Sequence, residues 1–496
     1  MVWVAAAALL FVIQTVTVLV AEYRKPAKTV SWLLVMTVLP VVGFALYGIL
    51  ASGYVRRTRY AYDISGGTGY AYDISGRKRY AYDAYDVAGR SNVCGLATSS
   101  ANALDGDSWA EALPDEYDRL TAYLRRVPQA PLRLYNETEV YADCGRVYEA
   151  MLEALEEASQ HICFQFYTFR FDGVGRRFQQ TLMRKARSGV RVRFMYDGVG
   201  SYGIDRARLD ELRAAGVETR VFLPPLFALF HKRVNCRNHR KIVVIDGLTA
   251  FVGGINIGEE YVGGNGKLGY WRDTHLRIKG DAVRDIQQLF MEDWALAGGK
   301  TPESDVFCFP EHGIREVQPM QLVSGGPNRR ADTILEVYVA AMMSARTSIY
   351  LVTPYFIPDP SIAMALKTAA AAGLDVRIIC PRRPDSRFVH WASMSYVREM
   401  MEEGVKCFRY TAGFIHAKVL IVDGQFACAG TSNMDMRSFF SNFELNMILL
   451  HQPTVDRLLA DYEADLSKSE PIPAADGRSP LRKAGEICAR LLSPLL

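Results

Sequence analysis

The sequence lacks any cysteine pattern that would hold a disulfide framework or a zinc ion. Its nine cysteines are scattered over 496 residues, and no two of them form a Cys-x-x-Cys pair. Odd-numbered, scattered cysteines favour a reducing compartment, so we interpret them as buried thiols. The sequence also lacks a large excess of one sign of charge, because the formal net charge is only +4. A balance this even does not by itself indicate nucleic acid or an anionic lipid as the partner.

Charge is absent from two long stretches near the N-terminus, residues 2–21 and 30–50. Each is long enough to cross the roughly 30 Å of hydrocarbon in a bilayer. The first stretch has no basic segment before it and the second follows at once, which favours a transmembrane hairpin over residues 1–51 rather than a cleaved signal peptide. We expect Pro40 and Gly43 to kink the second span. More basic residues follow the second span than lie in the connector, which favours a cytoplasmic catalytic part.

A short tandem repeat follows the hairpin. The sequence Tyr-Ala-Tyr-Asp-Ile-Ser-Gly occupies residues 60–66 and returns at 70–76, and a third copy begins at Tyr80. A ten-residue period cannot bury a core, so residues 52–112 are predicted to be a flexible linker. Contact of its Tyr and Arg side chains with a membrane surface is the alternative. From Leu113 onward the composition is that of an ordinary globular protein.

The rest of the chain repeats one pattern loosely, in residues 113–300 and again in residues 301–496. In each part a helix, a strand, a second helix and a second strand precede a third apolar strand. The predicted elements are 147–158, 162–167, 177–188 and 190–196 in the first part, and 334–345, 349–352, 362–372 and 376–379 in the second. This order predicts an α/β fold whose sheets are covered by helices.

The third apolar strand carries the strongest signal in the sequence. Both parts contain His, one residue, Lys, four residues, Asp, six residues, Gly, and then Asn three positions after that Gly. The matching residues are His239, Lys241, Asp246, Gly253 and Asn256 in the first part, and His416, Lys418, Asp423, Gly430 and Asn433 in the second. A duplicated match of this length predicts one composite site to which both parts contribute.

The residue types in this motif suit chemistry on a phosphate. His and Lys two positions apart on a strand point to the same face. Two imidazoles, whose reference pKa lies near neutrality, suit a nucleophile and a general acid. Lys and Asn are donors for phosphate oxygens. The glycines predict a close approach of the backbone to a ligand.

The two aspartates of the motif, Asp246 and Asp423, complete the candidate catalytic set, but they follow the lysines by five residues. At that distance along a strand a structural role, such as binding turn amides, is favoured over proton transfer. Arg237 and Arg437 suit either a lipid phosphate or pairing with acids. His275 lies near the site and has no assigned role.

The duplicated motifs resemble the HKD motifs of the phospholipase D superfamily, and the words at 235–241 and 433–438 resemble its bacterial cardiolipin synthase branch. The resemblance covers most of the chain outside about residues 52–105. It implies two similar phospholipase D-like α/β/α halves around a pseudo-twofold, with the site at their interface. It also implies that Asp273 and Glu444 orient the histidines, and that neither a metal nor another cofactor is required.

The resemblance further implies the reaction: two phosphatidylglycerols give cardiolipin and glycerol through a phosphohistidine. The near symmetry of the motifs does not decide which histidine is the nucleophile, and analogy with the superfamily assigns it to His239. The expected partners are phosphatidylglycerol and the bacterial cell membrane, with the oligomeric state open. A hydrolytic phospholipase D or another phosphatidyltransferase is the alternative. A nuclease is less favoured, because no basic stripe with interleaved aromatics runs beside the motifs, and so is an inactive membrane scaffold.

Overall fold

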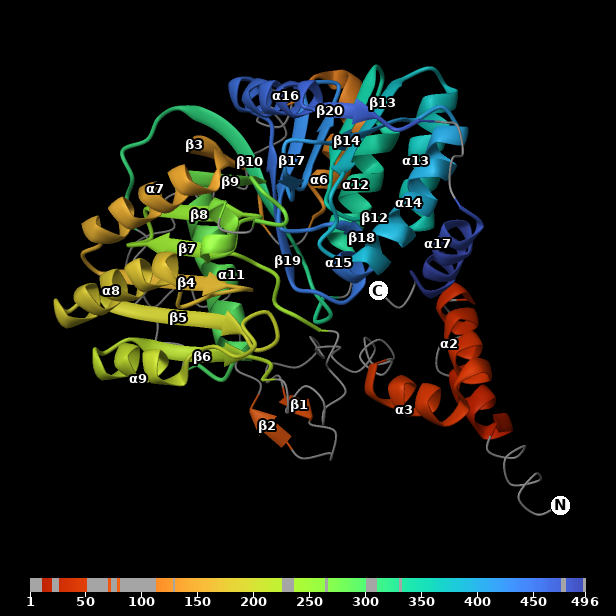
Figure 1. Ribbon diagram of the computed structural model, residues 1–496. Coiled ribbons are helices and arrows are strands. Elements are labelled where there is room, and N and C mark those ends of the chain that lie inside the picture. The colour runs from red at the N-terminus through yellow and green to blue at the C-terminus, as the bar shows by residue number, and fades with distance from the viewer. Residues whose placement is uncertain are drawn as a thin grey trace, which may run out of the picture.

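The computed structural model describes the catalytic body and parts of the N-terminal region (Figure 1). The described residues are 11–19, 26–50, 70–72, 78–80, 113–127, 130–224, 236–263, 266–299, 310–329, 332–473 and 479–493. Most of the predicted first span and of the predicted linker therefore lies outside the described residues. Within the linker, β1 (Tyr70–Tyr72) pairs antiparallel with β2 (Lys78–Tyr80).

One mixed sheet runs through the body, and its strand order repeats on either side of a central pair. At the centre, β3 (Arg133–Asp143) pairs antiparallel with β10 (Val317–Gly325). Outward from β3 come β9 (Trp271–Gly280), β8 (Thr249–Gly253), β7 (Ile242–Ile245), β4 (His161–Phe166), β5 (Arg191–Asp197) and β6 (Glu218–Phe222). Outward from β10 come β19 (Glu444–Leu449), β17 (Phe426–Gly430), β16 (Val419–Val422), β11 (Ser348–Val352), β13 (Asp375–Pro381), β14 (Lys406–Tyr410) and β20 (Ser469–Pro471).

Each side of the sheet thus contains three parallel strands, β4–β5–β6 and β11–β13–β14, and on the second side β20 adds an antiparallel strand beyond β14. Parallel strands need crossover connections, and helices supply them. On one side these are α8 (Gly173–Arg187) and α9 (Arg206–Ala214), preceded by α7 (Cys144–Glu157). On the other they are α13 (Pro360–Ala371) and α14 (Arg387–Glu402), preceded by α12 (Thr333–Met343). The predicted α/β fold with covered sheets is confirmed.

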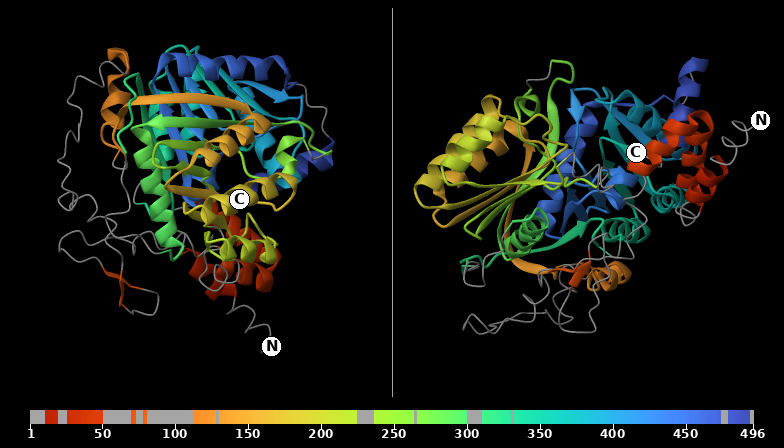
Figure 2. Two further views of the ribbon diagram at one scale, coloured as in Figure 1. Left: turned by 90° about the vertical axis from the view of Figure 1, so that its left-hand side faces the viewer. Right: turned by 90° about the horizontal axis from the view of Figure 1, so that it is seen from below.

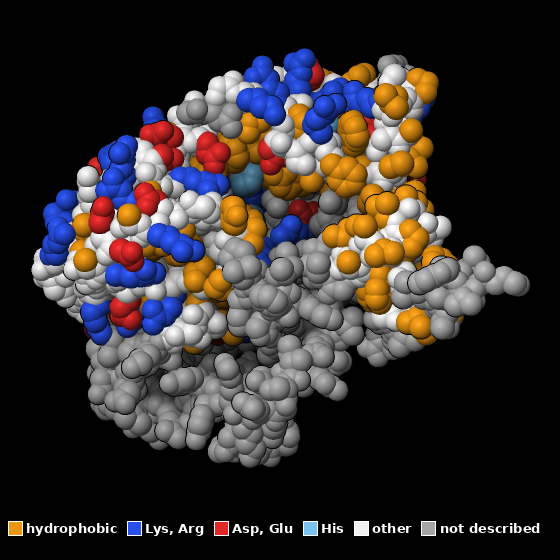
Figure 3. All heavy atoms as spheres, turned by 60° about the horizontal axis from the view of Figure 1, so that its bottom comes forward, with side chains coloured by type: hydrophobic (Ala, Val, Ile, Leu, Met, Phe, Trp, Pro, Cys, Tyr) orange, Lys and Arg blue, Asp and Glu red, His pale blue; other side chains and the backbone are white. Residues whose placement is uncertain are grey.

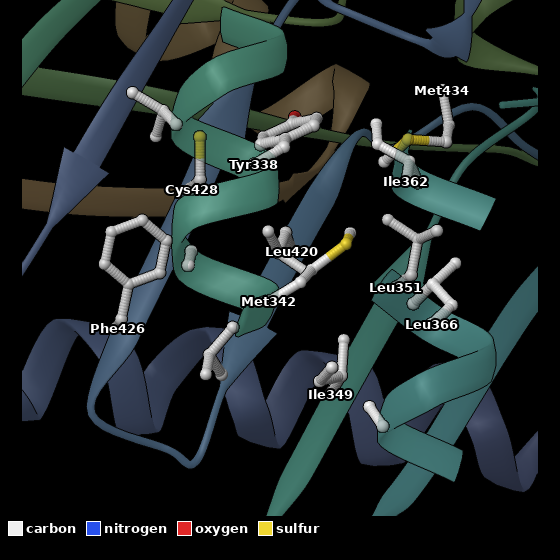
Figure 4. Packing of buried hydrophobic residues seen from close by; sticks show 14 of the residues in the cluster. Tyr338, Met342, Ile349, Leu351, Ile362, Leu366, Leu420, Phe426, Cys428 and Met434 are labelled. Atoms are coloured by element: carbon white, nitrogen blue, oxygen red, sulfur yellow. The ribbon is translucent and has the colours of Figure 1, made fainter. Parts of the chain in front are cut away.

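Three apolar cores hold these layers together. The helices α7, α8 and α9 pack on the outer face of the first set of strands, and α12, α13 and α14 pack on the second set. Figure 4 shows this second core, in which Tyr338 and Met342 of α12 face strand residues such as Leu420 and Phe426. The third core contains α11 (Ala282–Leu296), α16 (Gln452–Ser467) and strands of both sides. It joins the two halves, which lie side by side in Figure 2.

The segment before β3 packs on the far half of the body. A 3₁₀ turn (Asp115–Tyr117) leads into α6 (Asp118–Leu124), whose buried residues belong to the core of α12, α13 and α14. The Tyr117 hydroxyl donates a hydrogen bond to Asp423 Oδ2 at 2.8 Å. The chain therefore contacts the second half before it builds the first.

The N-terminal helices are short and folded against each other. The predicted second span is divided at Leu39 into α2 (Pro26–Val38) and α3 (Pro40–Leu50), as expected for a proline that cannot donate to the preceding turn. The Trp32 and Tyr47 ring centroids lie 5.2 Å apart. Fifteen residues of straight helix would separate them by about 22 Å, so the chain turns back here. Among the described residues, no helix is long and apolar enough to span a bilayer.

The C-terminal helix α17 (Pro480–Leu492) docks on the second half. Its Ala489 is buried against Ala392 of α14 and Ile357, and the Ser31 hydroxyl of α2 donates a hydrogen bond to the Leu491 carbonyl at 2.5 Å. The opposite face of α17 is exposed, with Leu481 at 84% and Ile487 at 60% exposure. The apolar C-terminal sequence therefore contacts the body along one face and leaves an apolar face exposed.

Candidate active site

Each motif histidine lies on a segment that pairs with a strand of the other half. Asn238 forms an isolated parallel bridge with Phe443, and the His239 amide donates to the Phe443 carbonyl at 2.9 Å. This pairing places His239 beside Glu444, the next residue after Phe443 and the first of β19. The site is therefore built across the junction of the two halves.

The second histidine repeats this arrangement. The short strand β15 (Phe414–Ile415) pairs in parallel with the first two residues of β9, and the His416 amide donates to the Arg272 carbonyl at 2.6 Å. His416 consequently lies beside Asp273 of β9.

The two imidazoles are hydrogen-bonded to carboxylates of the opposite halves. His239 Nδ1 lies 3.0 Å from Glu444 Oε2, and His416 Nδ1 lies 2.6 Å from Asp273 Oδ2. Because an ionised carboxylate only accepts hydrogen bonds, the Nδ1 of each ring carries the hydrogen. The Nε2 lone pair of each ring is then available for attack or proton transfer. The sequence indicated both carboxylates, but not that each one serves the histidine of the other half.

Buried donors hold the carboxylates in place. Glu444 accepts hydrogen bonds from the Thr431 hydroxyl at 2.5 Å and from Asn442 Nδ2 at 3.2 Å. Asp273 accepts one from the Thr274 amide at 2.8 Å. Burial raises the pKa of Asp273, but Lys418 and His416 outweigh that effect and lower it to about 2. The pKa of Glu444 is lowered too, since His239 and Lys241 outweigh its burial. Both carboxylates are therefore charged at neutral pH.

Both motif histidines are neutral at neutral pH. Burial lowers the pKa of His239 to about 4 against the opposing effect of Glu444. Burial and then the Lys418 ammonium lower the pKa of His416 to about 4, with Asp273 opposing them. A neutral imidazole is the form that attacks phosphorus, so the nucleophile needs no activation by a separate base.

The two lysines supply positive charge that depends on pH. Burial lowers the pKa of Lys241 to about 7 and that of Lys418 to about 8. Each Nζ donates to the carbonyl of its own histidine, at 2.6 Å for Lys241. Both Glu444 and Asp273 raise the pKa of each lysine, and Lys418 lowers that of Lys241. The charged groups of both motifs therefore act within one electrostatic site.

The two asparagines are buried close to these groups. Asn256 Oδ1 accepts a hydrogen bond from the Thr168 amide at 3.1 Å. The Asn433 backbone amide donates to the Ser438 hydroxyl at 3.2 Å, and its Oδ1 is buried without a partner in the described part of the chain. A buried polar atom with no partner is costly, so it marks a position where a ligand donor would be stabilised.

The contacts of Asp246 and Asp423 fit the structural role rather than the catalytic one. Asp246 accepts hydrogen bonds from the amides of residues 159, 160 and 161. Asp423 does the same for residues 346, 347 and 348. Both have a positive φ, 53° and 54°. A strand of four residues lies between each aspartate and the lysine of its motif. At the rise of a β-strand the five-residue step spans about 16 Å, so both carboxylates lie far along the strand from the imidazoles.

The motif glycines make room for protein and not for a ligand, which corrects the prediction from the sequence. A Cβ on Gly254 would lie 2.1 Å from Asp273 Oδ1, and one on Gly253 would lie 2.6 Å from His275 Nδ1. A Cβ on Gly430 would lie 2.2 Å from the Leu445 carbonyl. These glycines allow the carboxylate-bearing strands to approach the motif strands closely.

Several residues around the site were missed by sequence reasoning. The Tyr167 ring packs edge-on to His239 with centroids 5.0 Å apart, and the Trp271 ring lies 5.1 Å from His416. Trp271 stands two positions before Asp273 on β9, so strand alternation could have placed it on the same face. Arg240 is buried and forms a 2.5 Å ion pair with Asp293. Arg237, which was a candidate from the sequence, is also buried. Its Nη1 lies 3.7 Å from Asp197 Oδ1, which favours pairing with an acid over lipid binding.

The chain resembles known proteins over nearly its whole length. The family model described as cardiolipin synthase, PLD-like domain, matches residues 151–294 and 338–466. A cardiolipin synthase of Geobacillus sp. (strain WCH70) is 39% identical over 482 residues, which cover 96% of this chain and 90% of that protein. Cardiolipin synthase 2 of Bacillus anthracis is 37% identical over 487 residues, covering 97% of this chain and 89% of that protein.

The solved structures add a likeness of fold. A phosphatidylserine synthase of Haemophilus influenzae superimposes with a TM-score of 0.57 at 14% identity, covering 77% of this chain and 100% of that one. Together with the duplicated motif and its cross-paired histidines, these matches show that the chain belongs to the cardiolipin synthases with phospholipase D-like domains.

Proposed function

We propose that this chain is a cardiolipin synthase, which transfers a phosphatidyl group from one phosphatidylglycerol to another and releases glycerol. The relatives named cardiolipin synthase, similar over 96% of the chain, support cardiolipin as the product. The observation that carries the proposal is the pair of imidazoles, each held at Nδ1 by a buried carboxylate of the other half. That arrangement suits a phosphohistidine intermediate and an acid–base partner.

In the first step His239 is the nucleophile. Its Nε2 attacks the phosphorus of the donor, the bond from phosphorus to the glycerol oxygen breaks, and His416 gives a proton to the departing oxygen. The pKa of His416 is about 4 in the empty site. The negative charge of a bound phosphodiester raises that pKa and allows the ring to carry the proton it donates.

In the second step His416 acts as the base. It takes the proton from a hydroxyl of the acceptor phosphatidylglycerol, whose oxygen attacks the phosphorus while the bond to His239 breaks. Both histidines return to their starting states. Lys241, Lys418 and the two asparagines stabilise charge on the non-bridging oxygens through both steps.

The reaction is tested with purified full-length protein, labelled phosphatidylglycerol in mixed micelles, and a chelator. Cardiolipin and glycerol in equal amounts are expected, since the lysines and asparagines supply the charge stabilisation. Phosphatidic acid as the main product would instead identify a hydrolase, cleavage of DNA under the same conditions a nuclease, and no turnover an inactive scaffold. The His416→Ala variant is expected to trap a phosphatidyl-enzyme. Trapping by His239→Ala instead would reverse the two roles.

We also propose that the N-terminal apolar segments anchor the enzyme in the bacterial cell membrane as two spans, with the body in the cytoplasm; the second span requires α2 and α3 to straighten at Leu39 from the turned-back arrangement described above. Support comes from the two uncharged stretches and from exposed apolar residues on α2 and α3, among them Val38 at 69% and Val41 at 72% exposure. Hydrophobic side chains gather over this part of the molecule, at the right of Figure 3. A cysteine introduced at Lys28 should react with a membrane-impermeant reagent that is added to intact cells, because the connector faces the outside. Labelling only after lysis would place the connector inside the cell and contradict this orientation.

A further inference from the structure

A polar pocket of about 340 Å³ lies on the far side of Trp271, a wall residue whose ring also packs against His416. It lies within the range of ~300–1,000 Å³ that is usual for small-molecule sites. Its lining comes from both halves: Thr168 and Arg170 follow β4, Glu260 and Lys267 lie between β8 and β9, and Asp385 lies between β13 and α14. Figure 3 shows a histidine side chain in a hollow of this face with basic side chains at its rim.

The pocket adjoins the His416 side of the site. Its wall includes Trp271, whose ring packs against His416 with centroids 5.1 Å apart. Trp271 is only 7% exposed, and its Nε1 has no hydrogen-bond partner among the described residues. Thr168, also in the wall, donates its amide to the side chain of Asn256. Asp385 raises the pKa of Lys418, so it too lies within electrostatic reach of the second motif.

The lining suits a polar ligand with hydroxyls and a phosphate. Arg170 and Lys267 are exposed cations that match a phosphate. Glu260 and Asp385 are carboxylates that accept hydrogen bonds from hydroxyls, and Trp271 Nε1 is a donor. An acyl chain in this pocket would remove water from four charged groups without offering them a polar partner, which is unfavourable.

We propose that this pocket binds the glycerol phosphate headgroup of the acceptor phosphatidylglycerol and presents its free primary hydroxyl to His416. This inference rests on the proposed function and adds the acceptor site to it. The hydroxyl oxygen forms the new bond to phosphorus as the bond to His239 breaks, and the hydroxyl proton passes to His416 Nε2. Occupation of the pocket by the headgroup keeps water from that position, so the pocket selects transfer over hydrolysis.

The test separates the two steps in the full-length enzyme. Released glycerol reports the first step, and the ratio of cardiolipin to phosphatidic acid reports the choice of acceptor. The Arg170→Met/Lys267→Met double variant and Glu260→Gln should release glycerol in the first turnover as the wild type does. Their ratio of cardiolipin to phosphatidic acid should fall about tenfold or more, since each loses charge-assisted hydrogen bonds to the acceptor.

Matched controls are Arg187→Met and Glu157→Gln, exposed residues on the outer helices, which should leave the ratio unchanged. An unchanged ratio in the pocket variants, or an equal loss of glycerol release and cardiolipin, would overturn the acceptor site. If the wild type releases no glycerol from phosphatidylglycerol, the proposed function itself fails. That outcome differs from failure of the acceptor site alone, in which the wild type still releases glycerol.

A second measurement needs no variant and covers the case of a pocket variant that does not fold. Soluble sn-glycerol 1-phosphate added to the wild type should suppress cardiolipin formation while first-turnover glycerol release continues. Suppression of both would place the probe on the catalytic phosphate site and overturn the proposal, as would no suppression. Inorganic phosphate at the same concentration should suppress cardiolipin formation less, since it lacks the hydroxyls that Glu260 and Asp385 accept.

Discussion

The two halves contribute the same residues to the active site, but the surroundings of their histidines differ. His239 is held by Glu444, which also accepts hydrogen bonds from Thr431 and Asn442. His416 is held by Asp273 at a shorter distance, 2.6 Å, with Lys418 Nζ 2.7 Å from the same ring nitrogen. Tyr167 and Trp271 of the first half pack against His239 and His416 respectively, and His416 also stacks on Phe414 of its own half, with centroids 5.9 Å apart. A duplicated motif can therefore supply two chemically distinct histidines, because what surrounds each motif is not duplicated.

The largest expected effect comes from removing either imidazole. His239→Ala and His416→Ala should each lower cardiolipin synthesis by about 10³-fold or more, because each ring makes or breaks a bond in both steps. The two differ in the trapped intermediate, which mass spectrometry of the quenched protein detects. His451→Ala is the matched control, since this ring has a local hydrogen bond to Thr454 and is part of neither motif. Equal trapping in both motif variants would remove the proposed difference between the halves.

The next largest effect tests the cross-pairing itself. Asp273→Asn should lower activity by about 10²- to 10⁴-fold, because an amide no longer fixes the ring tautomer or supports the cation. It should accumulate the same phosphatidyl-enzyme as His416→Ala, although Asp273 belongs to the half that carries His239. Adding Asp273→Asn to His416→Ala should cost little more. Additive losses in that double variant would contradict the pairing.

The lysines predict a pH dependence on the alkaline side. Their ammonium forms hold the phosphodiester, and their pKa values in the empty site are about 7 and about 8. These values lie below the ordinary lysine value near 10.4, so positive charge is lost as the pH rises through 7 to 8. The value of kcat/KM for phosphatidylglycerol should fall over that window while kcat changes less. Lys418→Met should be slower at every pH and should lose the upper part of this decline.

The smallest effect on activity is expected at the motif aspartates. Asp246→Asn or Asp423→Asn keeps the left-handed backbone, which Asn tolerates, but weakens hydrogen bonds to three amides. Unfolding free energy should drop by about 1–3 kcal/mol for either variant, measured by urea denaturation, with activity per folded molecule nearly retained. Amide donors hold both aspartate pKa values low against burial. This stabilisation is present above the unfolded pKa near 3.9 and is lost as the pH falls below it. A loss of kcat without a loss of stability would return these residues to the catalytic set.

Sequence periodicity predicted the elements nearest the site well. The expected elements at 147–158, 162–167, 349–352 and 376–379 correspond to α7, β4, β11 and β13, with ends shifted by up to three residues. Strong apolar alternation or runs marked each of them. The second crossover of each half, α9 with β6 and α14 with β14, was not predicted, because these strands are short and carry charged residues.

The histidines, lysines, aspartates and asparagines of the motifs could be named from the duplicated spacing, and the family resemblance added Asp273 and Glu444, but the arrangement of these residues could not be predicted. Nothing in a symmetric pair of motifs tells whether His239 meets Asp273 or Glu444. That choice depends on the bridges from Asn238 to Phe443 and from Ile415 to Arg272, which join distant segments. The glycine prediction failed for the same reason, since the partner that needs the space is a strand of the same half and not a ligand.

The packing of Leu113 to Leu124 on the second half has a consequence for synthesis on the ribosome. This segment emerges first among the body residues, yet the core that receives it includes Val337, Tyr338 and Phe426. At ~5–20 residues per second, more than two hundred further residues take on the order of 10–40 s to appear. During that interval the apolar residues of this segment lack the core that will receive them. A nascent chain of this enzyme is therefore most exposed to proteases and chaperones around residues 113–124, until the last third has been translated.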